Sequence, residues 1–295
     1  MKASDLTLDS PQSMLFKGPF GFGKTLAAAS FALQGPVFMS YWDKKRPIEL
    51  LTFFTKERFG AKSEQIMDNI TFEVYSAENA NEYLNKVIDL VQDCRYTAVI
   101  NDSLTFMTAS AVNWSLNFGK DKKLHKKIKD ILPDWDEYKV ETSLITQCID
   151  LSKKLPCHVI WTAHPLPTTR VEGGGNSMRV TKVNSLVSYG SKVAAMVPGG
   201  FTEIYHFSQQ NDYADGKTTK RYVAMMDSIG DEFAKSPLLG SHYKELDFTN
   251  KLFYEVWKEA IDAAQSKIVE SKAEPTASAT EQTVLANPFA TKWKV

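Results

Sequence analysis

The residues with the clearest chemical potential form one short run near the start of the chain. Residues 18–25 read GPFGFGKT, a full match to the phosphate-loop pattern GxxxxGK[ST]. Glycines in this pattern let the backbone curl so that its N–H groups point at phosphate oxygens, beside the positive end of the following helix. The lysine can reach the β- and γ-phosphates of a nucleotide, and the threonine hydroxyl can bind Mg2+.

We therefore expect ATP and Mg2+ as ligands of this loop. The residues expected to bind the nucleotide are Gly18, Gly21, Phe22, Gly23, Lys24 and Thr25. The competing interpretation is a glycine-rich turn that precedes an ordinary helix.

A second acid is needed for the magnesium shell, and the run AVIND at residues 98–102 supplies one. Asp102 stands at the end of an apolar, strand-like segment, where phosphate-loop proteins place a carboxylate that reaches the metal through water. We expect Asp102 to act with Thr25 in holding Mg2+. The alternative is a helix N-cap before Leu104, a position that aspartate favours.

The elements that would position these residues alternate along the chain. From residue 13 to about 262, short apolar runs alternate with longer amphipathic stretches, which favours an α/β fold with a mostly parallel sheet covered on both faces. The expected strands are residues 14–17, 37–42, 71–75, 96–101 and 158–162. The expected helices between and after them are residues 25–33, 79–93 and 135–155.

After Pro198 the alternation of strand-like and helix-like stretches ends. Residues 201–207 and 221–226 predict two strands joined by a polar connection over 209–220, and a final helix is expected at 250–266. Residues 267–295 are rich in Ala, Thr, Ser, Glu and Pro, which predicts a disordered tail. The expected division is thus an N-terminal extension (1–12), one ATPase domain (13–266) and a tail (267–295). The end of that tail either binds a protein partner or has no binding role.

Charge and composition exclude several classes of protein. The 35 Lys+Arg residues balance 35 Asp+Glu residues, so any basic surface for nucleic acid or membrane has to be local. No apolar run approaches the roughly 18 residues that span a bilayer, and the first residues lack the apolar stretch of a signal peptide. The three cysteines form no CxxC pair, so we expect reduced thiols in a cytoplasmic protein that does not bind a membrane.

Taken in order, four motifs resemble the RecA-like recombinase and helicase core, and most closely the small phage-encoded RecA-like ATPases of single-strand annealing and recombination. The motifs are GPFGFGKT, AVINDS, HVIWTAHP and DEFAKSPL, and the resemblance covers about residues 13–260. It implies a RecA-like α/β core, ATP hydrolysis, assembly into a ring or filament, and the cytoplasm of a host cell as the location.

The resemblance also implies three further catalytic positions. Asp43, just after the strand at 37–42, corresponds to the water-activating carboxylate, although the family commonly has glutamate there. His164 follows the strand at 158–162, where the family keeps a polar residue that senses the γ-phosphate. Lys235 corresponds to the cation that completes a neighbouring subunit's ATP site, although Pro237 interrupts the usual run. Each also has a plain interpretation, as an exposed or structural side chain.

Two segments carry a net positive charge, unlike the chain as a whole, and predict binding of single-stranded DNA. Residues 120–129 read KDKKLHKKIK, and their candidate contacts are Lys122, Lys123, Lys126 and Lys127. The second segment, residues 165–196, is expected to be a long binding loop with a glycine triplet, and its candidate contacts are Arg170, Arg179 and Lys182. Basic grooves with stackable aromatic residues are typical of such binding. The alternative for 120–129 is a solvated helix face.

The sequence thus predicts a DNA-dependent ATPase that acts on single-stranded DNA in phage recombination or annealing. The alternatives left open are a DNA-translocating motor, either a helicase or a packaging ATPase, and a non-catalytic nucleotide-dependent protein that recruits partners through its tail. ATP hydrolysis with and without single-stranded DNA separates these classes.

Overall fold

The computed structural model describes most of the chain. It covers residues 10–42, 52, 56–57, 60–118, 133, 135–172, 179–186, 196–214, 217–228 and 234–273. Residues 118, 166–172, 179–186, 214, 217 and 268–273 are described by their backbone alone.

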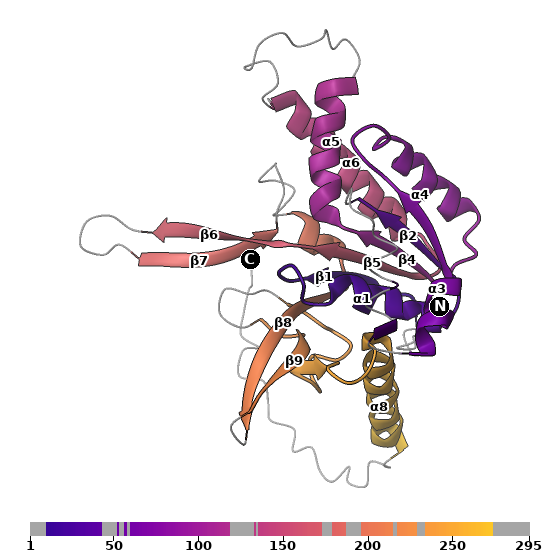
Figure 1. The fold of residues 1–295 in the computed structure, drawn as a ribbon, viewed down its shortest axis with the longest axis vertical. Helices are drawn as coiled ribbons and strands as arrows, with labels where there is room; N and C mark the ends of the chain where they lie inside the picture. Colours follow the sequence, from indigo (N-terminus) through magenta and orange to yellow (C-terminus); the bar gives the residue numbers. More distant parts are fainter. Residues whose placement is uncertain are drawn as a thin grey trace, which may run out of the picture.

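An eight-stranded sheet forms the centre of the molecule, in the order β10-β9-β8-β1-β5-β4-β2-β3 (Figure 1). Its strands are β1 (Ser13–Lys17), β2 (Val37–Tyr41), β3 (Ile70–Val74), β4 (Ala98–Asp102), β5 (His158–Ala163), β8 (Glu203–Ala214), β9 (Lys217–Met225) and β10 (Glu245–Asp247). The pairs among β1, β2, β3, β4, β5 and β8 are parallel, and β9 runs antiparallel to β8 and β10. The carboxyl ends of β1, β4 and β5 therefore lie at one edge.

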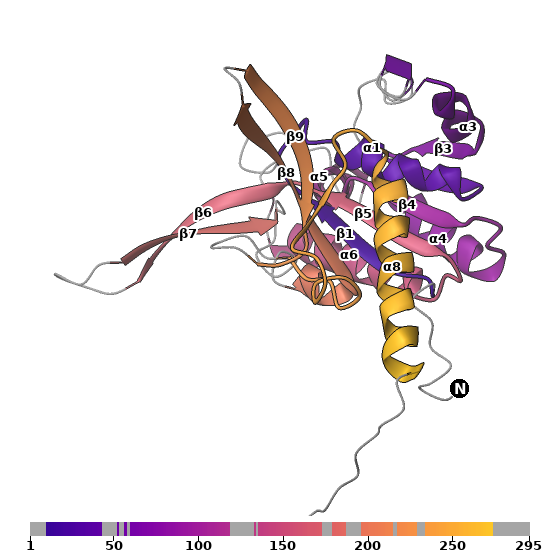
Figure 2. The ribbon, with the colours of Figure 1, turned by 90° about the horizontal axis from the view of Figure 1, so that it is seen from below.

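Helices cover both faces of this sheet (Figures 1 and 2). The helices are α1 (Lys24–Ala29), continued by a 3-10 turn at Ser30–Leu33, α3 (Lys62–Asp68), α4 (Glu82–Gln92), α5 (Leu104–Phe118), α6 (Trp135–Ser152) and α8 (Phe253–Ala273), with a 3-10 turn at Val197–Gly200. One core lies under α1 and α8, and the other lies under α4, α5 and α6. Strands buried on both faces are near-continuous apolar runs, as parallel sheets require.

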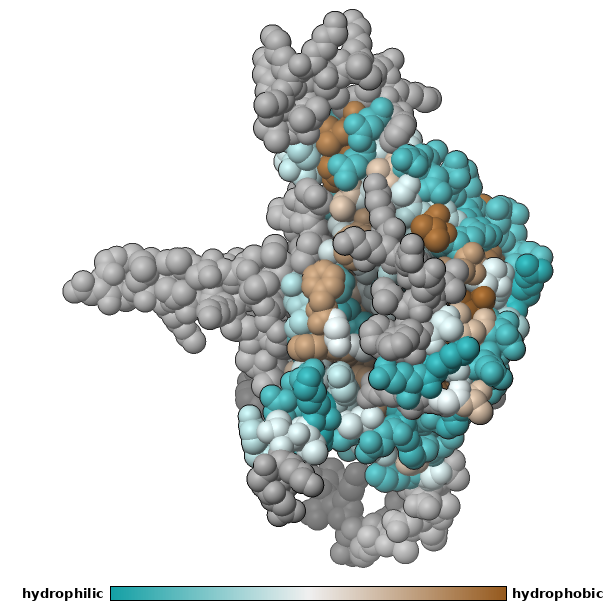
Figure 3. Space-filling view, in the orientation of Figure 1, coloured by the Kyte–Doolittle hydropathy of each residue, from teal (hydrophilic) through white to brown (hydrophobic). Residues whose placement is uncertain are grey.

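The expected fold class is confirmed as an architecture: a mostly parallel α/β sheet flanked by helices, with the phosphate-loop motif after the first strand and an antiparallel hairpin late in the chain. Among the described residues, the structure has no helix with the length and apolar character needed to span a membrane. Figure 3 shows a mostly hydrophilic described surface on the face in view, with small separate hydrophobic patches.

The segment after His164 differs from its expected form. Instead of a long structureless loop, β6 (Pro165–Glu172) and β7 (Arg179–Leu186) form an antiparallel ribbon that projects from the body (Figure 1). The physical reason is composition: LPTTRV and RVTKV are rich in threonine and valine, which favour strands. The prediction of an unstructured loop was wrong for these residues.

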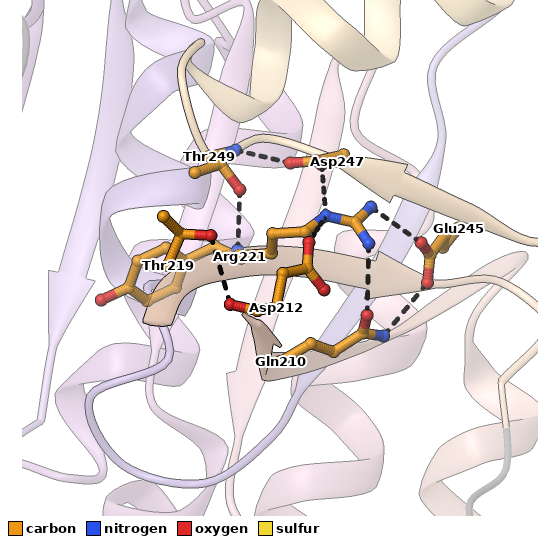
Figure 4. A network of polar contacts seen from close by, with 8 residues as sticks. Gln210, Asp212, Thr219, Arg221, Glu245, Asp247 and Thr249 are labelled. Carbon is orange, nitrogen blue, oxygen red and sulfur yellow. Dashed lines mark hydrogen bonds and ion pairs between the residues drawn. The ribbon is translucent and has the colours of Figure 1, made fainter. Parts of the chain in front are cut away.

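The late hairpin is also longer than expected. Residues 209–214 and 217–220, expected as a polar connection, extend β8 and β9, with Asn211 paired to Lys220 and Asp212 to Thr219. Arg221 braces this extension (Figure 4): its guanidinium donates to Asp247 Oδ2 at 2.9 Å and Glu245 Oε1 at 3.1 Å, and lies 3.5 Å from Asp212 Oδ2. Polar strands of this kind are stabilised by charge pairing rather than by burial, so their hydropathy resembles that of a loop.

At the C-terminal side, α8 continues to Ala273 and so includes residues 267–273, which were expected to belong to the tail. Lysine, glutamate and alanine in that stretch are good helix formers, which explains the extension. The expected tail beyond Ala273 and most of the expected N-terminal extension lie outside the described residues.

Helix α8 docks through an aromatic cluster. Trp257 is 2% exposed, its ring lies 5.4 Å from that of Phe31, and its indole N–H donates to Tyr205 Oη at 3.0 Å. Tyr205 Oη in turn donates to Glu203 Oε2 at 3.1 Å. The helix is thus joined to β8 by packing and by one chain of hydrogen bonds.

We predict that Trp257→Ala lowers the free energy of unfolding by about 3–5 kcal/mol, because it removes a buried aromatic ring and leaves a cavity. Urea unfolding followed by circular dichroism measures this change. Glu259→Ala, on the exposed side of the same helix, is the control and should change stability by about 0.5 kcal/mol or less. Equal effects of the two substitutions would contradict a docked α8.

Candidate phosphate-binding site

The loop at residues 18–23 connects the carboxyl end of β1 to the amino end of α1, and two glycines shape it. The Gly18 N–H donates to Ala163 O at 3.2 Å, and a Cβ placed on Gly18 would lie 2.4 Å from Phe207 O. Gly23 has φ of 83°, a left-handed conformation that strains other residues, and it directly precedes α1. The loop therefore lies tightly against β5 and β8 and opens into the start of the helix.

Lys24 points back into this loop. Its Nζ lies 2.7 Å from Gly18 O, 2.7 Å from Pro19 O and 3.3 Å from Nδ1 of His164. An ammonium group has three N–H donors, so all three have acceptors here. Lys24 is 5% exposed, and burial lowers its pKa to about 8, an effect that the charge of Asp102 partly offsets. The lysine is therefore held mainly in its charged form at neutral pH.

Thr25 and Asp102 meet beside the lysine. Thr25 Oγ1 donates to Asp102 Oδ2 at 2.7 Å, and Thr162 Oγ1 donates to Asp102 Oδ1. A hydroxyl next to a carboxylate offers the hard oxygen atoms that Mg2+ prefers, and Mg2+ usually takes its remaining ligands from phosphate and water. Within the described residues, no group of three or more His, Cys, Asp or Glu side chains could hold a metal by itself. This pair therefore fits a metal that arrives with a phosphate ligand.

His164 closes the other side of the loop. Its backbone N–H donates to Thr105 Oγ1 at 2.9 Å, and its ring stacks on Phe20 with centroids 3.7 Å apart. Burial and the neighbouring Lys24 charge lower the pKa of His164 to about 4, against a smaller opposite effect of a hydrogen bond to the Gly18 backbone. Because an ammonium can only donate, the neutral ring accepts from Lys24 at Nδ1.

The structure brings together most of the residues expected at the nucleotide site. Gly18, Lys24, Thr25, Asp102 and His164 surround one point at the carboxyl ends of β1, β4 and β5, where open α/β sheets bind ligands.

Phe22 has a different place, because its side chain packs against the core under α1 and α8. Its expected contribution to nucleotide binding is therefore limited to its backbone N–H.

Other expected residues lie away from this point or outside the described part of the chain. Lys235 is exposed, and its backbone pairs with Ile204 near the amino end of β8. Arg170 lies on β6, and Arg179 and Lys182 lie on β7. The residues that lie outside the described segments are Asp43, Lys122, Lys123, Lys126 and Lys127.

Three residues of the site were not predicted from the sequence. Thr162 binds the carboxylate of Asp102, Thr105 binds the backbone of His164, and Phe20 stacks on the His164 ring. Thr162 could have been found, because it is a polar residue near the carboxyl end of an apolar strand beside His164. Phe20 carried no such signal, since its position in the motif accepts any residue.

No protein-family model matches the sequence, and no curated protein matches it significantly. Among solved structures, the fold is similar to a KaiC-like protein from the hyperthermophilic archaeon Pyrococcus horikoshii OT3, with a TM-score of 0.45, 11% identity, and coverage of 81% of this chain and 85% of that one. It is also similar to the flagellar accessory protein FlaH from Methanocaldococcus jannaschii, with a TM-score of 0.44, 12% identity, and coverage of 81% and 84%. Both similarities concern the fold alone.

The depressed pKa of His164 predicts a specific loss of stability in acid. The folded-state pKa of about 4 lies below the ordinary value of 6.5, so between these values the unfolded chain binds more protons and stability falls as the pH falls. Between pH 7 and pH 5, the wild type should lose about 2 kcal/mol more than His164→Gln, which has no titrating group there. Urea unfolding at both pH values measures the difference.

The control for this prediction is His242→Gln, which removes an exposed histidine. It should lose as much stability as the wild type over the same pH change. If His164→Gln also loses as much as the wild type, the imidazole is not buried in its neutral form.

Proposed function

We propose that this protein is a RecA-like P-loop ATPase that binds MgATP, hydrolyses it, and acts on single-stranded DNA in recombination or strand annealing of phage DNA. The observation that supports the ATP site most directly is the joint placement of Lys24, Thr25 and Asp102 at the mouth of the phosphate loop. A cation, a hydroxyl and a carboxylate there match the groups that a nucleotide triphosphate and its metal require.

In this proposal Lys24 exchanges its contacts with Gly18 O, Pro19 O and His164 Nδ1 for the β- and γ-phosphates, where its charge stabilises the transferred phosphoryl group. Mg2+, when bound, neutralises charge that develops on the phosphate oxygens. Thr25 and Asp102, the latter oriented by Thr162, are the residues that would hold the metal, Thr25 through its hydroxyl and Asp102 through water. Asp43 is proposed as the base for the attacking water, because it follows β2, whose last residue Tyr41 pairs with Asp102.

The element proposed to bind DNA comes directly after a residue of the nucleotide site in the sequence. His164 contacts Lys24, and the next residue, Pro165, begins the projecting ribbon of β6 and β7. The positive residues of this ribbon are Arg170, Arg179 and Lys182. A change at Lys24 on ATP binding therefore reaches the proposed DNA-binding element through His164 and Pro165. The lysine run at 120–129 is a second proposed contact.

We also propose that the active form is a ring or filament of identical subunits. Lys235 is exposed near the amino end of β8, whereas the phosphate loop of the same chain lies at the carboxyl end of the neighbouring strand β1. This separation supports the proposal that Lys235 serves a second subunit rather than its own. The tail is proposed as a site for a further protein partner.

We predict that Lys24→Ala abolishes ATP hydrolysis while the protein stays folded. Loss of the phosphate-binding cation should reduce turnover by about 10²-fold or more. Phosphate release measures hydrolysis, and circular dichroism confirms the fold. The matched control is Lys62→Ala, an exposed lysine paired with Glu255, which should keep wild-type turnover. Wild-type turnover in Lys24→Ala would refute the nucleotide site.

The same assay with added single-stranded DNA distinguishes the proposed function from its alternatives. Stimulated hydrolysis without strand displacement supports recombination or annealing, and stimulation with strand displacement indicates a motor. ATP binding without hydrolysis indicates a nucleotide-dependent recruitment protein.

We predict that replacing Arg170, Arg179 and Lys182 together by Ala weakens single-stranded DNA binding equally for all sequences. Each lost phosphate contact should reduce the slope of log affinity against log salt concentration by about 0.7. Fluorescence anisotropy of labelled oligonucleotides at several salt concentrations measures both effects. ATP affinity should not change.

The control carries the same loss of three charges elsewhere, as Lys62→Ala, Lys251→Ala and Lys258→Ala combined. Its DNA affinity and salt slope should match those of the wild type. If the ribbon variant also matches the wild type, the ribbon is not the DNA site and residues 120–129 become the leading candidate.

A further inference from the structure

The third residue of the phosphate loop, Phe20, makes a contact that the proposed chemistry does not use. Its side chain is 67% exposed, and it belongs to neither of the two hydrophobic cores. Its ring nevertheless stacks on the His164 imidazole, with centroids 3.7 Å apart and an angle of 19° between the planes. A large apolar ring on an exposed glycine-rich loop therefore contributes to the site rather than to the core.

Phe20 and its neighbours fix the orientation of the imidazole. Phe106 makes a T-shaped contact with the same ring, with centroids 6.1 Å apart and an angle of 76°, and the two phenylalanines are 6.5 Å from each other. Stacked and edge-to-face contacts of this kind restrict rotation of a ring. The orientation of the imidazole is thus set by stacking on the phosphate loop and by a T-shaped contact with α5.

This orientation decides what the imidazole can contact. With the ring held against Phe20, its Nδ1 faces Lys24 Nζ at 3.3 Å. The other two acceptors of Lys24, Gly18 O and Pro19 O, belong to the loop itself, so His164 provides the contact that links Lys24 to β5 and β6. Since all three N–H donors of Lys24 are occupied, binding a phosphate oxygen requires one of these contacts to be given up.

We propose that Phe20 is a positioning residue, which holds the His164 imidazole toward Lys24. When Lys24 moves to a phosphate oxygen, its contact with the imidazole is lost, and this change occurs next to the first residue of β6. This inference rests on the proposed ATP site for its consequence, but the stacking itself exists without any ligand. Phe20 thereby gives a variable position of the phosphate-loop motif a defined role in this chain.

The first test measures the stacking in the protein without nucleotide. A ring stacked face to face shifts the Hε1 proton resonance of His164 upfield, and His164→Gln identifies that resonance by its loss. Phe20→Leu should move the resonance downfield toward those of the other histidines, and Phe20→Tyr should leave it in place. Tyr213→Leu, which removes an aromatic ring that is 80% exposed on the β8–β9 hairpin, is the matched control and should not move it.

The second test measures the consequence for hydrolysis. Phe20→Leu should lower kcat about tenfold with KM for ATP changed about twofold or less, and Phe20→Tyr should restore kcat. Combining Phe20→Leu with His164→Gln should lower kcat no further than His164→Gln alone, because both changes remove the same interaction. The midpoint of urea unfolding of Phe20→Leu should equal that of the wild type, which separates positioning from a structural role.

Three results would overturn the proposal: an unmoved His164 resonance in Phe20→Leu, additive effects in the double variant, or a raised KM with unchanged kcat. If the wild type hydrolyses no ATP, the proposed function fails instead. The resonance measurement then still decides whether Phe20 positions His164.

Discussion

The arrangement of the site depends on one electrostatic constraint, the need to keep the buried ammonium of Lys24 solvated by protein atoms. A charge removed from water has to be paired or fully hydrogen-bonded, or it shifts its pKa and loses the proton. Here two loop carbonyls and the imidazole of His164 replace water, and the carboxylate of Asp102 stabilises the charge from nearby. The strands β1, β4 and β5 therefore have to end at the same edge of the sheet, since each leads into one of these groups.

In the free protein, the groups that a triphosphate would need are already present, but they are hydrogen-bonded within the site. Lys24 binds the loop that would hold phosphate, and Thr25 binds the carboxylate that would act at the metal. Each contact satisfies a polar group that would otherwise be buried without a partner, which is costly. Ligand binding then exchanges hydrogen bonds rather than creating them.

The sequence predicted the parts of this structure that depend on local patterns. GPFGFGKT placed the loop correctly because the motif is a contiguous run in which Gly23 meets a local backbone requirement, a left-handed conformation. The apolar runs at β1, β2, β4 and β5 were visible because both faces of these strands are buried. The outer part of β8–β9 was not visible, since polar strands resemble loops. The ribbon β6–β7 was missed because a glycine triplet and charged residues interrupt its threonine- and valine-rich runs. Contacts between distant residues, such as Phe20 on His164, arise only when the sheet brings β1 and β5 side by side.

The β6–β7 ribbon has a mechanical consequence. Its eight residue pairs are joined to the body at the end next to His164 and project away from it (Figures 1 and 2). A strand rises about 3.3 Å per residue, so the far end lies about 26 Å from the base, and a tilt of about 10° there would move it by about 4–5 Å. The ribbon therefore has the geometry of a lever arm, in which a small rotation at the base, next to His164, corresponds to a displacement of several ångströms at the far end.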